Sequence, residues 1–449
     1  MHDSFSDQIT GLLSSLRQQL CAPGFIARHR VRAADFTRQR QLTFPVIMLF
    51  ALQKTAKSLQ RHLHEFLDEL ADGELFEPVT TSAWTHARAK LKHTAFLELN
   101  QELVVPAIYG PAPVFAVQRW HGRRLLGIDS SIIRLPNTTD MLAQFTPVEV
   151  VNNHGKTGTS YPEGRISVLY DLLNHVALDG RLERSSVGEV PLAIEQLAHA
   201  APSDVTIFDR GFTGYRFLAW HHKRGVNYVG RCSSSSFAAS QQFFRQNRAQ
   251  RSIVVKLVAP RHERADLQRV GLPLELTVRF VSARLPTGEL EVLVTSLLDE
   301  EEFRTAEFAA LYHRRWDHET FYGLVKGRLE LENFSGHTPE AVRQDFYSTL
   351  LLCNLETVLT ASTDAALQDS IRSGHPAKQL NRSVSFHAVK HQLIPLLYSD
   401  QPIDRVLAKL QSWFAGAPVT VRDQRKVPRR EPSFRRAYHF LRCLKKAVF

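Results

Sequence analysis

One short stretch of the chain, YHRRWDHETFYGLVK, carries four side chains whose types and spacing suit chemistry on a phosphodiester. Tyr312, Arg315, Glu319 and Lys326 follow one another at intervals of three, four and seven residues. At about 100° per residue, these intervals put all four on one helix face about 60° wide, opposite a largely apolar side. A carboxylate flanked by a guanidinium, an ammonium and a phenol suits a phosphodiester bound to a metal ion. A solvated helix with a chance charge pattern can have the same spacing. Other segments of the chain are therefore needed to choose between a phosphodiester site and a solvated helix.

Two aspartates follow apolar, strand-like runs elsewhere in the chain. Asp129 follows LLGI, and Asp209 follows VTIF. An acid just beyond a buried strand is held rigidly at the sheet edge and stays wet enough to ionise. Hard Mg²⁺ ions take oxygen ligands, and paired ions clamp the attacking and leaving oxygens of a phosphoryl transfer. A single aspartate after a strand is more often a turn residue, but these two acids together with the Glu319 helix favour a metal site.

The other acids, the histidines and the cysteines have simpler interpretations. Asp171 and Asp179 flank turns, and Glu183 and Glu189 are expected to be solvated. None of the histidines noted, such as His318, has zinc-motif spacing, so they are expected to be structural or to face DNA. The 4 cysteines lie far apart without a C-x-x-C pair, which favours reduced residues.

The segments around the acids predict a mixed sheet. Strands are expected over RRLLGIDSS, RISVLYDL and HVALDGRLE, followed by a helix, the strand DVTIFDR, a second helix and the strand NYVGRC. Three strands followed by alternating helices and strands, with Glu319 on a later helix, is the element order of a ribonuclease-H-like fold. Residues 233–298 are rich in Val, Leu and Thr with Gly and Pro turns, and are expected to form a β-rich insertion.

The predicted fold class is therefore α/β. A ribonuclease-H-like catalytic core with a β-rich insertion is preceded by a helical N-terminal domain and followed by a helical, basic C-terminal portion. Thr338 and Pro339 are expected to cap and open a long apolar helix. The expected segments are a DNA-binding domain at 1–115, the first part of the core at 116–232, the insertion at 233–298, the second part of the core at 299–365, and the basic region at 366–449.

The N-terminal segment offers a candidate nucleic-acid reader. Thr80, Thr81 and Ser82 are candidate N-cap residues for a short helix in TTSAWTHARAKLK. Basic residues follow the turn, which is consistent with a helix-turn-helix reader; they are His86, Arg88, Lys90 and Lys92. A packing module with a basic solvated face explains the same pattern, and both interpretations stay open at this point.

Charge and hydropathy narrow the class of protein. The formal net charge is +11, which raises the expectation of a polyanionic partner. Residues 421–449 interleave ten Lys and Arg with aromatics, which suits either a DNA-facing helix or a basic solvated terminus. No apolar run reaches the roughly 18 residues of a membrane span, and the first residues lack a continuous apolar signal segment. We therefore expect a cytoplasmic protein without a membrane partner.

Taken together, these motifs resemble the DDE insertion-sequence transposases of bacteria that carry the Tyr-Arg-Glu-Lys motif. The resemblance rests on GIDSS around Asp129, on FDRGF around Asp209, and on the ungapped spacing from Tyr312 to Lys326. It extends to DFTRQRQLTF, TTSAWTHARAKL and LENFSGHTPEAV, and covers most of residues 30–360.

The resemblance implies a site, a cofactor and partners. Asp129, Asp209 and Glu319 would be the catalytic, metal-binding triad, with Mg²⁺ as cofactor and Mn²⁺ as a substitute. Tyr312, Arg315 and Lys326 would grip phosphates near the transposon end. The activity implied is cut-and-paste transposition at the nucleoid, in which a nicked end forms a hairpin, is opened and attacks target DNA. The partners implied are double-stranded DNA, both terminal inverted repeats and target, and a second copy in a homodimeric synaptic complex.

One departure from that family and several alternatives remain. Better-known members stack a tryptophan of the insertion on a flipped base, whereas residues 233–298 contain no Trp. The candidate rings there are Phe237, Phe243, Phe244 and Phe280. A metal-dependent nuclease that cuts without joining, and a non-catalytic, transposase-derived DNA-binding protein, are the alternatives. A metal-free hydrolase with paired carboxylates is disfavoured, because the neighbouring cations would keep Glu319 ionised.

Overall fold

The structure is a computed structural model that describes residues 2–38, 41–54, 58–71, 78–151, 157–249, 251–285 and 288–421. The chain divides into two compact units, each built from separated segments. The first lies within Met1–Val117, Arg134–Pro162 and Val325–Phe449, and the second within Gln118–Ile133 and Glu163–Leu324. The two units combine parts of the five segments that the sequence predicts. The division of the chain into those five domains stays a prediction. The basic tail after Val421 lies outside the described residues.

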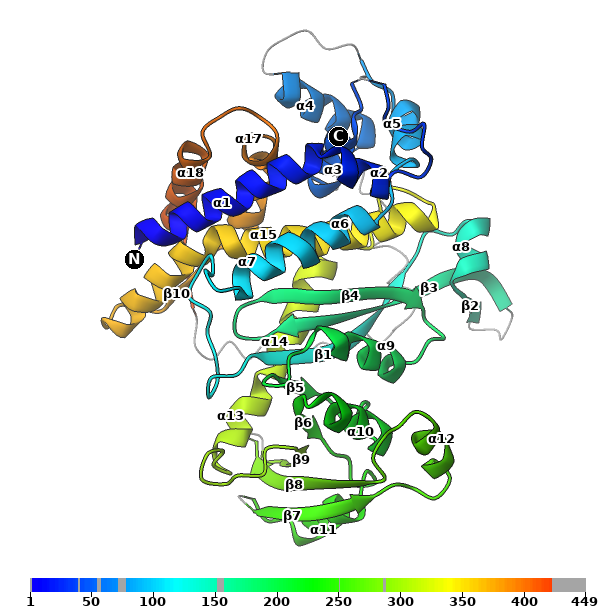
Figure 1. The fold of residues 1–449 in the computed structure, drawn as a ribbon, viewed down its shortest axis with the longest axis vertical. Coiled ribbons are helices and arrows are strands. Elements are labelled where there is room, and N and C mark those ends of the chain that lie inside the picture. The colour runs from blue at the N-terminus through cyan, green and yellow to red at the C-terminus, as the bar shows by residue number, and fades with distance from the viewer. Residues whose placement is uncertain are drawn as a thin grey trace. The chain divides into compact units, whose positions relative to one another are not determined.

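Most of one mixed sheet belongs to the second unit. Its path runs β2-β3-β1-β5-β6-β9-β8-β7, with β4 paired to β3 (Figure 1). The strands are β1 (Leu125–Arg134), β2 (Thr146–Val151), β3 (Thr157–Asp171), β4 (Val176–Arg184), β5 (Val205–Phe208), β6 (Asn227–Arg231), β7 (Ser252–Val258), β8 (Glu275–Arg284) and β9 (Leu290–Thr295).

Five of these strands have the connectivity of a ribonuclease-H-like core. β1 pairs with β5, and β5 with β6, in parallel, whereas β3 and β4 are antiparallel. Helices α9 (Glu189–Gln196), with its short extension η2 (Leu197–His199), and α10 (Tyr215–Arg224) connect the later strands. All four residues of β5 and the first four of β1 are buried, as parallel strands covered on both faces require. The predicted strands and helices are present in the predicted order, and the fold class is confirmed.

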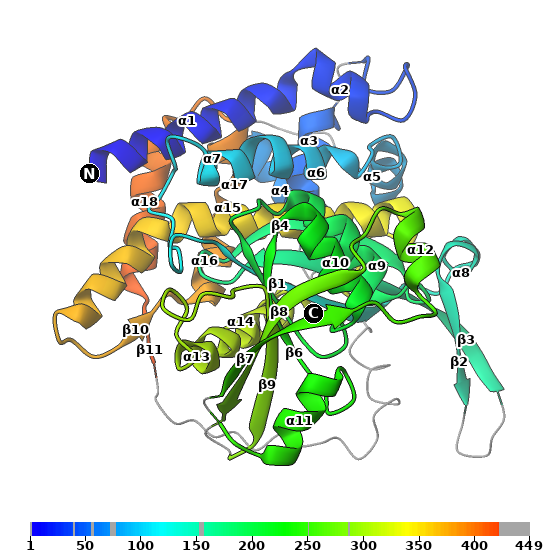
Figure 2. The ribbon, with the colours of Figure 1, turned by 60° about the horizontal axis from the view of Figure 1, so that its bottom comes forward.

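The predicted β-rich insertion extends this same sheet. β9 pairs antiparallel with β6, and β8 and β7 follow toward the edge, with helices α11 (Ala238–Gln246) and α12 (Arg264–Arg269) in the connections (Figure 2). Arg279 on β8 is fully buried, and its guanidinium donates to Ser252 Oγ, Phe303 O and Thr305 Oγ1 at 2.7, 2.8 and 2.9 Å. The insertion therefore fixes the loop that precedes helix α13 (Glu307–His313).

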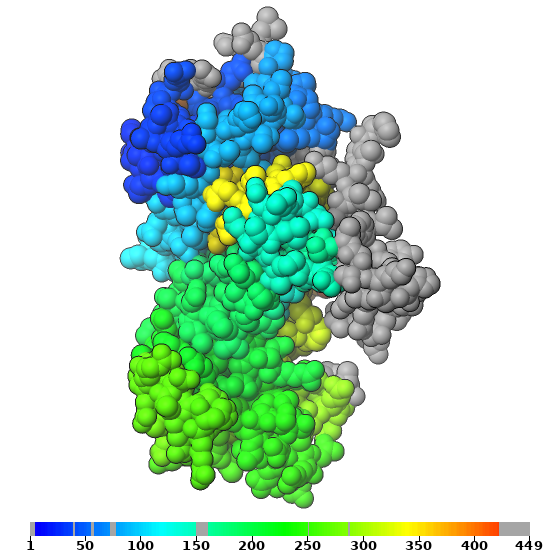
Figure 3. All heavy atoms as spheres, turned by 90° about the vertical axis from the view of Figure 1, so that its right-hand side faces the viewer, coloured from blue at the N-terminus to red at the C-terminus, as the bar shows by residue number. Residues whose placement is uncertain are grey.

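The first unit packs helices around one long helix, α15 (Pro339–Arg372), whose cap is formed by Thr338 as predicted. α15 contacts α3, α6, η1 and α18 among others, and appears as a yellow strip beside the blue N-terminal helices in Figure 3. No helix of the described residues, α15 included, is long and apolar enough to cross a bilayer. The remaining elements are α1 (His2–Cys21), α2 (Pro23–His29), α3 (Phe44–Leu52), α4 (Leu59–Ala71), α5 (Thr81–Arg88), α6 (Thr94–Glu98), η1 (Leu99–Val104), α7 (Val105–Tyr109), α8 (Thr139–Gln144), α16 (Arg382–His391), α17 (Leu393–Leu397), α18 (Ile403–Gly416), β10 (Lys378–Gln379) and β11 (Val419–Thr420).

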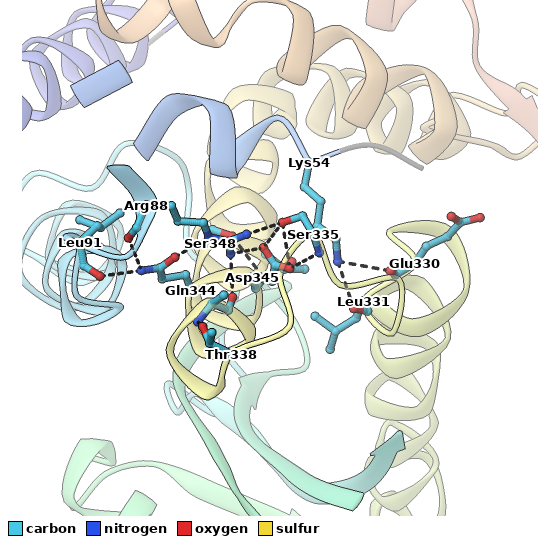
Figure 4. Close-up of polar contacts among 12 residues, drawn as sticks. Lys54, Arg88, Leu91, Glu330, Leu331, Ser335, Thr338, Gln344, Asp345 and Ser348 are labelled. Carbon is cyan, nitrogen blue, oxygen red and sulfur yellow. Dashed lines mark hydrogen bonds and ion pairs between the residues drawn. The ribbon is translucent and has the colours of Figure 1, made fainter. Parts of the chain in front are cut away.

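Arg88, at the end of α5, is turned into this helical unit. Its guanidinium is buried and donates to Asp345 Oδ1 and Ala341 O on α15, both at 2.7 Å (Figure 4). Further bonds reach Ser335 Oγ at 2.7 Å and Gln344 Oε1 at 2.6 Å. The prediction that Arg88 contacts DNA is wrong, because these partners occupy the group.

The other three basic residues of that candidate reader lie nearer the surface. His86 and Lys90 are exposed, whereas Lys92 is half-buried and its Nζ donates to Arg28 O at 3.1 Å. As DNA contacts, these three residues stay a prediction.

A second buried cation, Lys54, joins the network around Asp345. Its Nζ donates to Leu331 O at 3.0 Å and to Glu330 O at 3.4 Å (Figure 4). Burial alone would raise the pKa of Asp345, but the charges of Arg88 and Lys54 and hydrogen bonds from Ser335 hold that pKa below its ordinary value. The network therefore ties α5 and the residue after α3 to α15 and to the loop that precedes it.

Candidate active site

Asp129 and Asp209 lie on neighbouring parallel strands at the same edge. The register pairs Ile128 of β1 with Phe208 of β5, and Asp129 and Asp209 are the residues that follow them. Neighbouring strands lie about 4.8 Å apart, so the two aspartates are close together. The backbone orients both carboxylates: Asp129 Oδ1 accepts from Ser130 N, and Asp209 Oδ1 from Gly211 N, each at 2.8 Å. The sheet thus brings together two of the three acids that the sequence singles out.

Helix α14 (Arg315–Gly323) brings Glu319 to this edge. Arg315 Nη2 donates to Glu319 Oε1 at 2.8 Å, and Arg315 Nη1 lies 3.9 Å from Asp129 Oδ2. Tyr322 Oη donates to the main-chain oxygen of Asp129 at 2.8 Å. One guanidinium therefore links two of the predicted acids, and Tyr322 holds the helix against β1.

The close approach of α14 to β1 depends on Gly127. A Cβ at Gly127 would lie 2.7 Å from His318 Nδ1 and 2.8 Å from Leu172 Cδ2, so a larger residue would displace the helix. His318 is fully buried and stacks on Tyr322, and burial lowers the pKa of its imidazole to about 3. Of the two roles expected for the histidines, the structure gives His318 the structural one.

The predicted single helix from Tyr312 to Lys326 is wrong. α13 ends at His313, and two short-range bonds, Arg314 N to Leu311 O and Asp317 N to Arg314 O, interrupt the α-helical pattern before α14 continues. A π-helical segment, η3 (Leu324–Arg328), then follows α14. The motif is therefore carried by three consecutive helical segments and not by one uninterrupted α-helix.

Tyr312 stays close enough to Arg315 for the two groups to interact electrostatically, whereas Lys326 lies in another helical segment. Tyr312 is 3% exposed, and its Oη has no hydrogen-bond partner among the described residues. Burial raises the pKa of the Tyr312 phenol above its ordinary value. Lys326 is half-buried in η3 and belongs to the first unit. From the motif, Arg315 and Glu319 are the pair that the structure brings into contact.

A further acid, Glu189 at the start of α9, borders the same edge. Arg165 Nη1 donates to Glu189 Oε1 at 2.6 Å and to Ser130 Oγ at 2.9 Å. A Cβ at Gly211 would lie 3.1 Å from Asp209 Oδ1 and 3.7 Å from Glu189 Oε2. The carboxylates of Asp209 and Glu189 are therefore close to each other. The expectation of a merely solvated Glu189 is wrong, because its partner Arg165 lies on a strand that no local pattern connects to it.

The site holds an excess of negative charge. Burial, together with the charges of Asp209 and Glu189, raises the pKa of Asp129 to about 6, against the opposing effects of Ser130 and Arg315. Carboxylate oxygens are the ligands that Mg²⁺ and Mn²⁺ prefer, so the donor set fits such an ion. Within the described residues, no three acidic, histidine or cysteine side chains converge on one ion position as they stand. The Arg315 guanidinium is in contact with both Asp129 and Glu319.

The raised pKa of Asp129 predicts a pH-dependent stability. Folding favours the protonated carboxyl, because the pKa rises from 3.8 in the unfolded chain to about 6. Ionised Asp129 therefore destabilises the fold by about 3 kcal/mol above pH 7, at 1.36 kcal/mol per pH unit, and this penalty vanishes below about pH 4. We expect Asp129→Asn to raise the free energy of unfolding at pH 8 by up to about 3 kcal/mol and to change it little at pH 4.

Urea unfolding in EDTA at the two pH values measures this difference. Mg²⁺ at pH 8 should narrow the gap, because it stabilises the wild type more than the variant. An equal gain at pH 4 and pH 8 would show that burial of the Asp129 charge is not its cause.

Only some of the phenylalanine rings in the insertion are exposed enough to stack on a base. Phe280 and Phe243 are buried, and Phe280 packs against Phe237 and Phe243 with ring centroids 5.8 and 6.5 Å apart. The suggestion that Phe243 or Phe280 presents its ring to a base is therefore wrong, since both belong to the core. Phe237 and Phe244 are half-buried and stay candidates.

The site thus combines a ribonuclease-H-like sheet, acids at one of its strand edges, and a helix that carries Arg315 and Glu319. The sequence matches the transposase DDE domain family over residues 120–355, more than half of the chain, and the chain belongs to this family. The resemblance seen in the motifs is thereby confirmed.

Two known proteins show how far the similarity extends. The transposase InsG for insertion sequence element IS4 of Escherichia coli (strain K12) is 23% identical over 360 residues, which cover 78% of this chain and 77% of that protein. The piggyBac transposase, solved by cryo-EM as a synaptic complex with hairpin DNA, matches with a TM-score of 0.41 and 10% identity, over 93% of this chain and 86% of that chain.

Proposed function

We propose that this protein is the DNA transposase of a bacterial insertion sequence, which cuts the ends of its element and joins them to target DNA. One observation carries the proposal in a chain of the DDE family: Asp129 and Asp209 directly follow the last paired residues of the parallel strands β1 and β5, and Arg315 bonds Glu319 while lying 3.9 Å from Asp129. The IS4 relative, a transposase for an insertion sequence element, supports the same function.

Asp129, Asp209 and Glu319 would hold a divalent metal ion, Mg²⁺ or Mn²⁺. Such an ion activates the attacking oxygen and stabilises charge on the leaving oxygen of a phosphoryl transfer. Double-stranded DNA, as terminal inverted repeats and as target, is the proposed substrate, and a homodimer on paired ends is the proposed assembly. Arg315 and Lys326 are proposed to hold phosphates next to these acids, as delocalised and point charges respectively.

The decisive experiment uses the DNA that flanks the reading frame. Purified full-length protein is incubated in Mg²⁺ with a duplex that carries the flanking inverted repeat, and separately with the same end precleaved to a 3′-hydroxyl plus a target duplex. We expect cleavage of the first substrate and joining of the second. Cleavage without joining would identify a nuclease, and binding without cleavage in Mg²⁺ or Mn²⁺ would identify a non-catalytic DNA-binding protein.

The phosphate-binding role of Arg315 and Lys326 makes a separate prediction. Arg315→Ala and Lys326→Ala should each lower the rate of joining of the precleaved end by about 100-fold, because small misplacements of a reacting phosphate have effects of this size. Neither variant should weaken Mg²⁺ binding, since neither cation is a metal ligand. Single-turnover joining and calorimetric titration of Mg²⁺ measure the two effects.

Arg314 offers a matched control for Arg315. It is the preceding residue, its side chain is 57% exposed, and it lies 3.7 Å from Asp317 rather than beside the triad. Arg314→Ala should join DNA within a few-fold of the wild type. Weakened Mg²⁺ binding in Arg315→Ala would mean instead that this arginine supports the geometry of Asp129 and Glu319.

A further inference from the structure

Helix α10 presents a basic face to solvent. Its sequence, YRFLAWHHKR, contains no Asp or Glu. At about 100° per residue, four of its residues fall within an arc of about 100° and form what we call the α10 basic face: Arg216, Trp220, Lys223 and Arg224. The three cations are exposed, and the tryptophan is half-buried. This face is about 12 Å long at 1.5 Å per residue, a length over which one DNA strand carries about three phosphates.

The stability of α10 does not account for its basic face. Lys223 and Arg224 lie in the last turn, where cations interact favourably with the helix dipole. Lys223 Nζ also donates to Val270 O at 2.7 Å. Arg216, by contrast, is the second residue of the helix, where the same dipole makes a positive charge unfavourable. A binding role explains why an arginine occupies that position.

Trp220 orients the cations at the far end of the face. Lys223 Nζ and Arg224 Cζ lie 5.0 and 5.8 Å from the centroid of its ring system. Cation–π contacts of this kind restrict the two side chains, and a restricted side chain loses less conformational entropy when it binds. A row of oriented cations on a helix without acids is complementary to the phosphates of a nucleic acid.

Helices α10 and α14 cover opposite faces of the sheet. Thr206 of β5 points to α10, where its Oγ1 lies 2.7 Å from His221 Nε2. The next residue of β5, Ile207, pairs with Gly127 of β1, and a Cβ at Gly127 would point to His318 of α14. Successive side chains of a strand point to opposite faces, and paired residues share a face. The sheet therefore separates a duplex on α10 from phosphates held at α14.

We propose that the α10 basic face binds the backbone of target DNA. The proposal rests on the proposed function, in which joining brings two duplexes to one set of acids. Arg315 of α14 is assigned to the element end, which leaves the other face of the sheet for the second duplex. The helix also begins at the acidic edge, since Thr213 Oγ1, just before α10, donates to Asp209 O at 3.2 Å. A strand that follows α10 therefore leads to the acids, and contacts to its phosphates suit targets of varied sequence.

Target capture tests this face on the full-length protein. The protein is bound to a precleaved end duplex in EDTA, and a labelled second duplex without the terminal repeat is titrated at several salt concentrations. For Arg216→Ala/Arg224→Ala we expect the Kd of the second duplex to rise about 10-fold at low salt, and the slope of log affinity against log salt to fall in magnitude by about 2. Affinity for the end duplex alone should not change. Arg216→Lys/Arg224→Lys should retain capture, because lysine also pairs with phosphate.

Two arginines outside α10 provide the matched control. Arg245 is exposed on α11, and the side chain of Arg372, the last residue of α15, is 79% exposed. Arg245→Ala/Arg372→Ala removes the same charge and should capture the second duplex as the wild type does.

Four results would overturn the proposal: wild-type capture by Arg216→Ala/Arg224→Ala, equal losses in the two alanine double variants, an equal loss of end binding, or no capture by the wild-type complex. Because capture is measured without metal, a protein that captures a second duplex through this face but never joins it would refute the proposed function alone.

Discussion

Replacement of any one of the three acids Asp129, Asp209 and Glu319 is expected to reduce end cleavage at least a thousandfold while leaving binding to end DNA nearly unchanged. In the proposed site the acids would provide metal ligands and would not touch phosphates directly, so chemistry and binding should separate. A thousandfold loss corresponds to about 4 kcal/mol in the activation barrier. Glu319→Gln is the sharpest of these changes, because it keeps the shape of the side chain and weakens a ligand for a hard cation. Cleavage in Mg²⁺ and mobility-shift binding in EDTA measure the two properties.

Glu183 is a suitable control acid for this series. It lies exposed on β4 in the same unit, and Glu183→Gln should cleave as the wild type does. Near wild-type cleavage by Asp209→Ala, for example, would remove Asp209 from the site and leave Glu189, its neighbour across the Gly211 position, as the acid to examine.

The second large effect is expected at Arg88, in the helical first unit. Arg88→Met leaves Asp345 buried with its main ion-pair partner removed, since Arg88 and Asp345 side chains are 4% and 0% exposed. Removing one member of a buried pair typically destabilises a protein by about 3–5 kcal/mol. We therefore expect a loss of this size in the free energy of unfolding, measured by urea denaturation.

Two further variants separate this structural role from DNA binding. Lys90→Ala, at an exposed position two residues away, should change stability by less than about 0.5 kcal/mol. Arg88→Met combined with Asp345→Leu should recover part of the loss, because the uncompensated charge is gone. A lowered DNA affinity of Arg88→Met with an unchanged unfolding curve would contradict the structural role of Arg88.

The elements that carry Asp129 and Asp209 were predictable because their signals are local. In each case an apolar run of four residues precedes the acid, which predicts a buried strand segment and the carboxylate that follows it. β5 ends directly before Asp209 as expected, whereas β1 continues through Asp129 to Arg134. The cap at Thr338 is equally local, since its hydroxyl accepts from Ala341 N three residues away. Such features depend on neighbours in the chain, so the sequence alone contains them.

The side chains that were misassigned depend on partners distant in sequence. Arg88 meets Asp345, 257 residues further along, and no pattern within α5 distinguishes a buried arginine from a solvated one. Glu189 likewise depends on Arg165 of β3. The predicted common face of Tyr312 and Lys326 assumed uninterrupted α-helical geometry, whereas the hydrogen-bond register changes at Arg314 and again in η3.

The long helix at the centre of the first unit also affects how this protein folds during its synthesis. All nine residues of α3 are buried, and α3 packs on α15, yet about 290 residues separate the two starts along the chain. At about 5–20 residues per second, the nascent N-terminal helices wait on the order of 15–60 seconds for that partner. During this interval an apolar segment such as FPVIMLFAL stands exposed, so prematurely terminated copies should be substrates for chaperones and proteases rather than competitors for DNA ends.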